Sequence, residues 1–129
     1  MLSDNTLSLA QAPNFAVLTT LMPDGVPQSH VMWVDADDSH ILVNTEIHRR
    51  KYKNVLANPL ATVTIMDRDN PFSFVEVRGK VVETVGGQEA RDHIDKLSLK
   101  YLGKVYGNQI QSERVILKIA PDREFGFPA

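Results

Sequence analysis

Residues 43–63 read VNTEIHRRKYKNVLANPLATV, and the pattern of this stretch changes twice. Its start completes a β-branched, apolar run over residues 40–45 that is typical of a strand. From Glu46 onward the apolar residues follow the helical period and share one face, formed by Tyr52, Val55 and Leu56. Asn58-Pro59 ends this helix, because proline cannot continue it, and a strand resumes over residues 60–67. The stretch therefore predicts a strand, a short helix and a second strand.

The start of this helix is strongly basic. Four permanent cations lie within five residues of a chain whose formal net charge is −2, and they are Arg49, Arg50, Lys51 and Lys53. The helix macrodipole disfavours cations at this end, whereas the unpaired N–H groups there favour an anion. A guanidinium group can bind a phosphate in bidentate fashion, with two parallel N–H···O hydrogen bonds. The cluster is interpreted either as a phosphate site or as a solvated basic face, and the residues alone leave both open.

The rest of the chain reads as strands with a few helical segments. Helices are expected at 3–12, 46–58 and 88–102, a turn at 35–39, and strands at 15–21, 26–35, 40–45, 60–67, 72–85, 114–120 and 123–127. A Pro-Asp-Gly turn at 23–25 joins the first two strands into a hairpin. Gly79 predicts a bulge or bend in the long strand. Glu76 and Arg78 share one face of this strand and are expected to form a cross-strand or inter-subunit ion pair, with substrate contact as the alternative. Consecutive hairpins predict a mainly β fold, an antiparallel barrel of about six strands with two or three short helices.

Composition narrows the classes of function. The chain has 129 residues, 43% hydrophobic and 23% charged, which suits a single globular domain over residues 1–129. It has no cysteine, which excludes disulfides, zinc–thiolate sites and thiol nucleophiles and fits a reducing compartment. Without a secretory signal or a long apolar run, the expected location is the cytoplasm, away from membranes. The slightly acidic net charge argues against nucleic acid as a partner.

The histidines and the tryptophan are candidate functional residues. The four histidines, at positions 30, 40, 48 and 93, lack the spacing of a metal site, and no metal is expected. His30 could donate a proton, although a hydrogen bond to a neighbouring carbonyl is favoured over catalysis. Trp33 is expected in the core or at an interface, and His48 either contacts phosphate or is exposed. No side chain is assigned a catalytic role.

An ordered set of motifs resembles the pyridoxamine-phosphate-oxidase-like split β-barrel superfamily. It comprises the stretch 43–63, the turn at 23–25 followed by Val-Pro-Gln-Ser at 26–29, Arg-Gly-Lys-Val at 78–81, Arg-Val-Ile-Leu-Lys-Ile at 114–119 and Phe-Gly at 125–126. The resemblance covers nearly the whole chain and implies an FMN-binding split β-barrel. Within the superfamily, the short chain is most similar to the flavin/deazaflavin oxidoreductases that use coenzyme F420.

This resemblance implies a homodimer with the cofactor in a groove at the subunit interface. Arg49 and Lys51, with Arg50 and Lys53, would hold the cofactor phosphate, and Thr45 would lie beside it. The residues that would lie along the ring system are Ser29, His30, Val31 and Met32.

The implied activity is hydride transfer between coenzyme F420 and a small organic substrate, with FMN as the alternative cofactor. Oxidation of vitamin B6 is not expected, because the C-terminal residues 127–129 do not provide the arginine and histidine segment of the longer members. Two other classes of function stay open. One is a flavin-binding redox or carrier protein without a dedicated substrate, and the other is a module whose basic helix binds RNA or acidic lipid.

Overall fold

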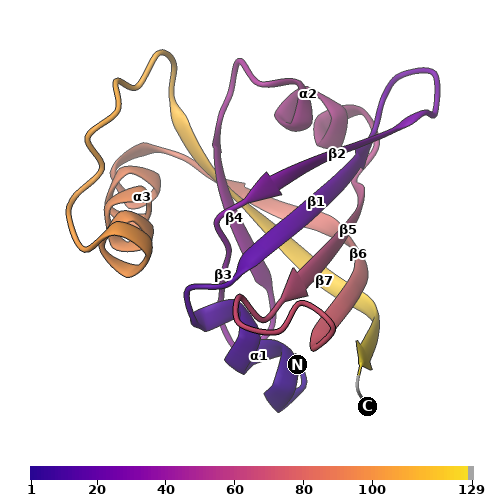
Figure 1. Cartoon of the computed structure of the whole chain (residues 1–129). Coiled ribbons are helices and arrows are strands. Elements are labelled where there is room, and N and C mark those ends of the chain that lie inside the picture. The colour runs from indigo at the N-terminus through magenta and orange to yellow at the C-terminus, as the bar shows by residue number, and fades with distance from the viewer. Residues whose placement is uncertain (128–129) are drawn as a thin grey trace.

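The strands form one curled antiparallel sheet in the computed structural model, which describes residues 1–127 (Figure 1). Seven strands follow the order β2-β1-β5-β6-β7-β4-β3 across the sheet. They are β1 (Phe15–Leu21), β2 (Pro27–Met32), β3 (Asp35–Ala36), β4 (Ile41–Glu46), β5 (Leu60–Met66), β6 (Phe74–Val85) and β7 (Arg114–Phe127). The expected mainly β split barrel is therefore confirmed, with seven strands in place of about six.

Alternate residues of the strands point into the barrel and form its core. Across three neighbouring strands Leu18 lies opposite Val63, which lies opposite Val77, and all three are buried. Burying one aliphatic side chain stabilises a fold by roughly 1.5–3 kcal/mol relative to leaving it exposed. The inward set predicted for the strand at 114–120 is buried as well: Val115, Leu117 and Ile119.

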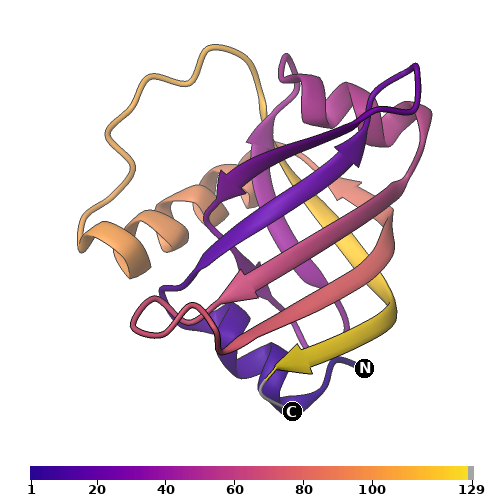
Figure 2. The same ribbon diagram turned by 45° about the vertical axis from the view of Figure 1, so that its right-hand side comes forward.

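The long strand β6 bends where the sequence predicts it to bend. Its pairing with β7 shifts register between Arg78 and Gly79. A Cβ atom at position 79 would lie 2.0 Å from the carbonyl oxygen of Ala120, so only glycine fits this close approach of two backbones. The irregularity lets β6 and β7 curl around the barrel (Figure 2).

The three helices cover different parts of the barrel (Figures 1 and 2). Helix α1 (Asp4–Gln11) lies at the end near both termini, and the Ser3 hydroxyl caps it by accepting from the Thr6 N–H at 3.2 Å. Helix α2 (Arg50–Ala57) lies at the opposite end. Helix α3 (Gly87–Leu102) packs outside the barrel against β7 and β4. None of the helices within residues 1–127 has the length and apolar character needed to cross a membrane.

Three predicted boundaries are wrong. The helix expected from Glu46 begins at Arg50, because β4 continues through Glu46, which pairs with Arg114 of β7. The return strand expected at 26–35 ends at Met32, and Asp35–Ala36, expected as a turn, form β3 by pairing with β4. The two strands expected at 114–120 and 123–127 are one strand, β7, whose pairing with β6 extends from Ile116 to Phe127 across two register shifts. In each case tertiary strand pairing overrides local sequence preference.

The sheet is open on one side. Strand β2 pairs only with β1, and β4 pairs with β7 and β3, so within residues 1–127 no ladder of hydrogen bonds joins β2 to β4. The chain crosses from one to the other through Trp33 and Val34 and then β3. We refer to the gap between β2 and β4 as the split, and the start of α2 lies beside it (Figure 2).

Candidate functional site

A cavity of about 350 Å³ lies at the split. This volume is within the range of small-molecule and cofactor sites. Strands β1, β2 and β4, the start of α2, helix α3 and the segment before β7 all contribute to its walls. The lining residues are Phe15, Val31, Met32, Trp33, Asn44, Thr45, Arg49, Lys51, Ile94, Leu97, Tyr106, Asn108 and Arg114.

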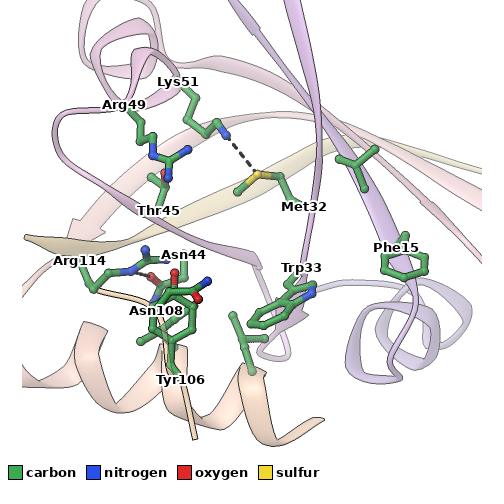
Figure 3. A pocket seen from close by; sticks show the side chains of 13 residues that line it. Phe15, Met32, Trp33, Asn44, Thr45, Arg49, Lys51, Tyr106, Asn108 and Arg114 are labelled. Carbon is green, nitrogen blue, oxygen red and sulfur yellow. Dashed lines mark hydrogen bonds between the residues drawn. The ribbon is translucent and has the colours of Figure 1, made fainter. Parts of the chain in front are cut away.

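The ammonium group of Lys51 is buried in this cavity without a strong acceptor. Lys51 is only 7% exposed, and its Nζ donates to the Sδ of Met32 at 3.3 Å (Figure 3). A thioether sulfur is a weak acceptor, whereas an ammonium group has three protons to donate. Burial, together with the nearby charges of Arg49 and Arg114, lowers the pKa of Lys51. The group is therefore desolvated and repelled by cations, and a bound anion would relieve both costs.

The start of α2 adds to this preference for an anion. Arg49 is the N-cap residue, no side chain caps the helix, and its first turn contains no acidic residue. Unpaired N–H groups and the positive end of the macrodipole therefore face the same region. Figure 3 shows the side chains of Arg49, Lys51 and Thr45 entering the cavity together. Neither of these two cations forms an ion pair with a residue that the structure describes.

Another cation of the cavity, Arg114, is paired inside the protein. Its Nε donates to the Oδ1 of Asn44 at 2.8 Å, and its Nη1 donates to the Oε2 of Glu46 at 3.4 Å. Burial would raise the pKa of Glu46, but N–H groups of Ser112 and Gln111 and the charge of Arg114 hold it below its usual value. Glu46 is thus ionised and balances the charge of Arg114.

The opposite end of the cavity is aromatic and aliphatic. Trp33 stacks on Tyr101 with ring centroids 5.1 Å apart and planes 5° apart, and it meets Tyr106 edge-on at 6.4 Å. Ile94 and Leu97 of α3 complete this wall. The cavity therefore has a cationic end and a flat, apolar end, which suits an elongated ligand with an anionic group and a ring.

The structure brings together five of the nine predicted binding residues, namely Val31, Met32, Thr45, Arg49 and Lys51. The other four lie outside this lining, and they are Ser29, His30, Arg50 and Lys53, all of them exposed. Arg50 and Lys53 lie three residues apart on α2 and so share its outer face. His48 is exposed too, and its Nδ1 lies 2.7 Å from the hydroxyl of Ser112.

The sequence did not predict several residues of the cavity lining, most of which are far along the chain from the basic helix: Phe15, Asn44, Ile94, Leu97, Tyr106, Asn108 and Arg114. Among these, Arg114 does carry a signal, because it is a cation at the start of an otherwise apolar strand. Glu76 and Arg78 do form an ion pair, with 2.8 Å between Arg78 Nε and Glu76 Oε1, but it lies within strand β6 and not across strands as expected. Residues 1–127 contain no cluster of three or more side chains arranged to hold a metal ion.

Comparison with known proteins agrees with this architecture. No curated protein is significantly similar in sequence. A solved structure described as an F420 reductase is 29% identical, with a TM-score of 0.82, over 96% of this chain and 98% of that one. A conserved hypothetical protein from Mycobacterium tuberculosis shares the fold at 22% identity and a TM-score of 0.73, over 98% of this chain and 84% of that one. General Stress Protein 26 from Bacillus anthracis also shares the fold, at 21% identity and a TM-score of 0.72, over 95% of this chain and 91% of that one.

The family comparison covers almost the whole chain. The profile described as Pyridoxamine 5'-phosphate oxidase matches residues 2–126, which include every strand and helix that contributes to the cavity. The curled sheet, the split and the basic start of α2 thus all lie within the matched part of the chain. The chain belongs to the pyridoxamine 5'-phosphate oxidase family.

Proposed function

We propose that the protein is an oxidoreductase that binds coenzyme F420, or alternatively FMN, in the cavity at the split. It would transfer a hydride between this cofactor and a small organic substrate. The observation that carries the proposal is the buried ammonium group of Lys51, whose hydrogen-bond partner is a thioether sulfur. A site that keeps a desolvated cation without an anion is costly, and a phosphate ester removes that cost.

The cationic end of the cavity fits a phosphate group. Arg49 can present a planar fork of donors, Lys51 a point charge, and the first turn of α2 its backbone N–H groups. Thr45 is buried beside them and lines the same wall. Arg50 and Lys53, on the outer face of α2, would contribute only through their longer-range field.

The apolar end fits a flat ring. Val31 and Met32 of β2 and Trp33 lie along this side, and the backbone of β2 has one edge without a strand partner in residues 1–127. Ser29 and His30 on the same strand would meet the ring or the substrate from this edge. When bound, the flavin or deazaflavin supplies the hydride chemistry, and the chain supplies anchoring, orientation and a shielded face.

Similarity to a solved F420 reductase at 29% identity supports the deazaflavin as the first choice of cofactor.

We also propose a homodimer, because two apolar residues of the cavity wall are exposed in the single chain. Val31 is 68% exposed and Phe15 is 40% exposed. A second copy that covers them would close the cavity and bury the open face of the ring.

Titration of the purified protein with coenzyme F420 and with FMN, followed by fluorescence quenching, tests the proposal. Lys51→Ala should weaken binding of the preferred cofactor by at least ~1.5 kcal/mol, about tenfold in Kd, because it removes a charge-assisted hydrogen bond. Lys80→Ala is the matched control, since Lys80 is exposed on β6 outside the cavity lining.

Failure of the wild-type protein to bind either cofactor, or unchanged affinity in the Lys51→Ala variant, would remove the proposal. Turnover of the reduced cofactor with a panel of electron-poor acceptors separates an oxidoreductase from a redox carrier. Salt-dependent binding to RNA or acidic vesicles, without cofactor binding, would support an interaction module instead.

A further inference from the structure

A continuous series of buried polar contacts runs through the wall of the cavity and includes Arg114. Its members are Asp35, His93, Asn44, Arg114 and Glu46, and each is 8% exposed or less. They come from β3, α3, β4 and β7, so tertiary folding alone brings them together. Burying five polar side chains is costly unless each one is satisfied by hydrogen bonds.

The hydrogen bonds determine how Asn44 is oriented. Its Nδ2 lies 2.9 Å from the carbonyl oxygen of Ala90, which can only accept, and its Oδ1 lies 2.8 Å from the Nε of Arg114, which can only donate. The amide therefore cannot be flipped without losing both bonds. The same Nδ2 lies 3.0 Å from the Nδ1 of His93, so that ring nitrogen accepts.

The orientation of Asn44 in turn determines the tautomer of His93. Because Nδ1 accepts, the proton of the neutral ring is on Nε2, which lies 3.1 Å from the Oδ2 of Asp35. Burial alone would raise the pKa of Asp35, but hydrogen bonds from His93, the Ala36 N–H and Lys96 lower it to about 2. The far end of this series of contacts is thus an ionised carboxylate that accepts from His93, whose other ring nitrogen accepts from Asn44.

Arg114 is held in place by two members of this series of contacts, Asn44 and Glu46. Its Nε and Nη1 bind Asn44 and Glu46, and its guanidinium group lies 5.3 Å from the centroid of the Tyr106 ring. No hydrogen bond from its Nη2 to a residue within 1–127 is found, and Arg114 lines the cavity (Figure 3). One nitrogen of a rigidly held guanidinium group therefore remains available to a ligand.

The charge balance indicates which part of a ligand Arg114 would take. Glu46 neutralises Arg114, whereas Arg49 and Lys51 have no ion-pair partner among the described residues. An anionic phosphate group is therefore matched by the two unpaired cations. A neutral acceptor, such as a ring carbonyl, is matched by Arg114, whose charge Glu46 already balances. Arg114 also lies beside Tyr106 at the apolar end of the cavity.

We propose that Arg114 binds the carbonyl-bearing edge of the cofactor ring, and that Asn44 and His93 are positioning residues that hold its guanidinium group in place. This inference rests on the proposed function, because it requires a flat redox ring in the cavity. It assigns ring recognition and phosphate recognition to different cations.

Paired ligands with and without phosphate test the assignment. FMN is compared with riboflavin, and coenzyme F420 with its phosphate-free deazaflavin alcohol, by fluorescence titration of the whole protein. Arg114→Lys should raise the Kd of both members of a pair about five- to tenfold and leave their ratio unchanged. Lys51→Ala should change the ratio, because it affects only the member with phosphate. Arg123→Lys, an exposed arginine on the same strand, is the control.

The outcomes separate the two hypotheses. If the wild-type protein binds no member of either pair, the proposed function fails. If it binds them and Arg114→Lys weakens only the phosphate-bearing ligands, or neither, the assignment of Arg114 is wrong. Should Arg114→Lys not fold, the variants of His93 provide the same test from a distance.

His93→Leu removes both hydrogen bonds of the ring, the one to Asn44 and the one to Asp35. His93→Gln keeps one acceptor and one donor, with a spacing similar to that of the two ring nitrogens. We expect His93→Leu to weaken both members of each pair by a similar factor and His93→Gln to restore most of the affinity. In the NMR spectrum the Arg114 Nε–H should exchange faster in His93→Leu, while backbone amides of β7 remain protected. Unchanged affinity and unchanged exchange of this proton in His93→Leu would overturn the positioning role.

Discussion

At the scale of single residues, the buried charges of this protein fall into two groups. Asp35 and Glu46 accept hydrogen bonds from cations and from backbone N–H groups, and Arg114 has a carboxylate partner. Lys51 is equally buried and has only the sulfur of Met32. Since unpaired buried charges are expensive, the exception indicates where a ligand binds.

The depressed pKa of Asp35 predicts a specific dependence of stability on pH. The carboxylate titrates near 2 in the folded protein and near 3.8 when unfolded. The stabilising contribution of this carboxylate to the free energy of unfolding is present above pH 3.8 and is lost as the pH falls through 2. The reason is that, as the pH falls, the unfolded chain takes up this proton before the folded protein does. Asp35→Asn should therefore reduce the free energy of unfolding at pH 7 by about 2 kcal/mol and by much less near pH 2.

Urea unfolding of both proteins between pH 2 and 7 measures this difference. Asp122→Asn, a change at an exposed position of β7, is the control. A difference between wild type and Asp35→Asn that stays constant over the whole range would show that the carboxylate charge is not responsible.

At the scale of elements, two features of the backbone shape the site. The shift between Arg78 and Gly79 allows β6 and β7 to curl, and β7 then carries Arg114 to the cavity. The late start of α2 leaves Arg49 as the N-cap, so that Arg49 and Lys51 face the cavity while Arg50 and Lys53 face outward. The sequence predicted a basic helix in this region, but only the observed start of α2 separates its four cations into two that face the cavity and two that face outward.

Gly79→Ala should be strongly destabilising because the new Cβ would overlap the carbonyl oxygen of Ala120, which is backbone and cannot rotate away. The expected loss is at least about 3 kcal/mol, the upper range for overpacked sites. In Gly86→Ala, just after the same strand, the new Cβ would lie 3.9 Å from the carbonyl oxygen of Arg114, so the loss should stay below about 1 kcal/mol. Equal melting temperatures for the two variants would argue against the close approach.

At the scale of the whole molecule, the site exists because the sheet does not close. The cavity occupies the split between β2 and β4, and α3 with the segment after it forms the outer wall. The exposed apolar residues on the open side, including Val31, are the reason to expect a second copy of the chain.

Val31→Asp should disrupt the proposed homodimer, because a carboxylate would be buried against an apolar surface of the partner. Size-exclusion chromatography with light scattering should show a dimer for the wild type and a monomer for the variant. Val82→Asp, at an exposed valine of β6 outside the cavity lining, is the control and should remain dimeric. A wild-type protein that is monomeric both with and without cofactor would contradict the expectation.

The sequence by itself determined most of the helices and strands, their order along the chain, and the presence of a basic helix between two strands. These depend on local preferences: β-branched runs, the helical period after Glu46, and the Asn58-Pro59 stop. The bend at Gly79 was also predictable, because a glycine inside a strand weakens it and typically marks a bulge or a close backbone approach.

Only the tertiary structure decided which residues meet. Asn44, His93 and Arg114 are distant in sequence and come together because β4 pairs with β7 while α3 packs across both. The same pairing extended β4 through Glu46, and pairing with β4 turned Asp35–Ala36 into a strand. Long-range contacts of this kind depend on the free energy of the whole packed fold, and no local pattern of residues encodes them.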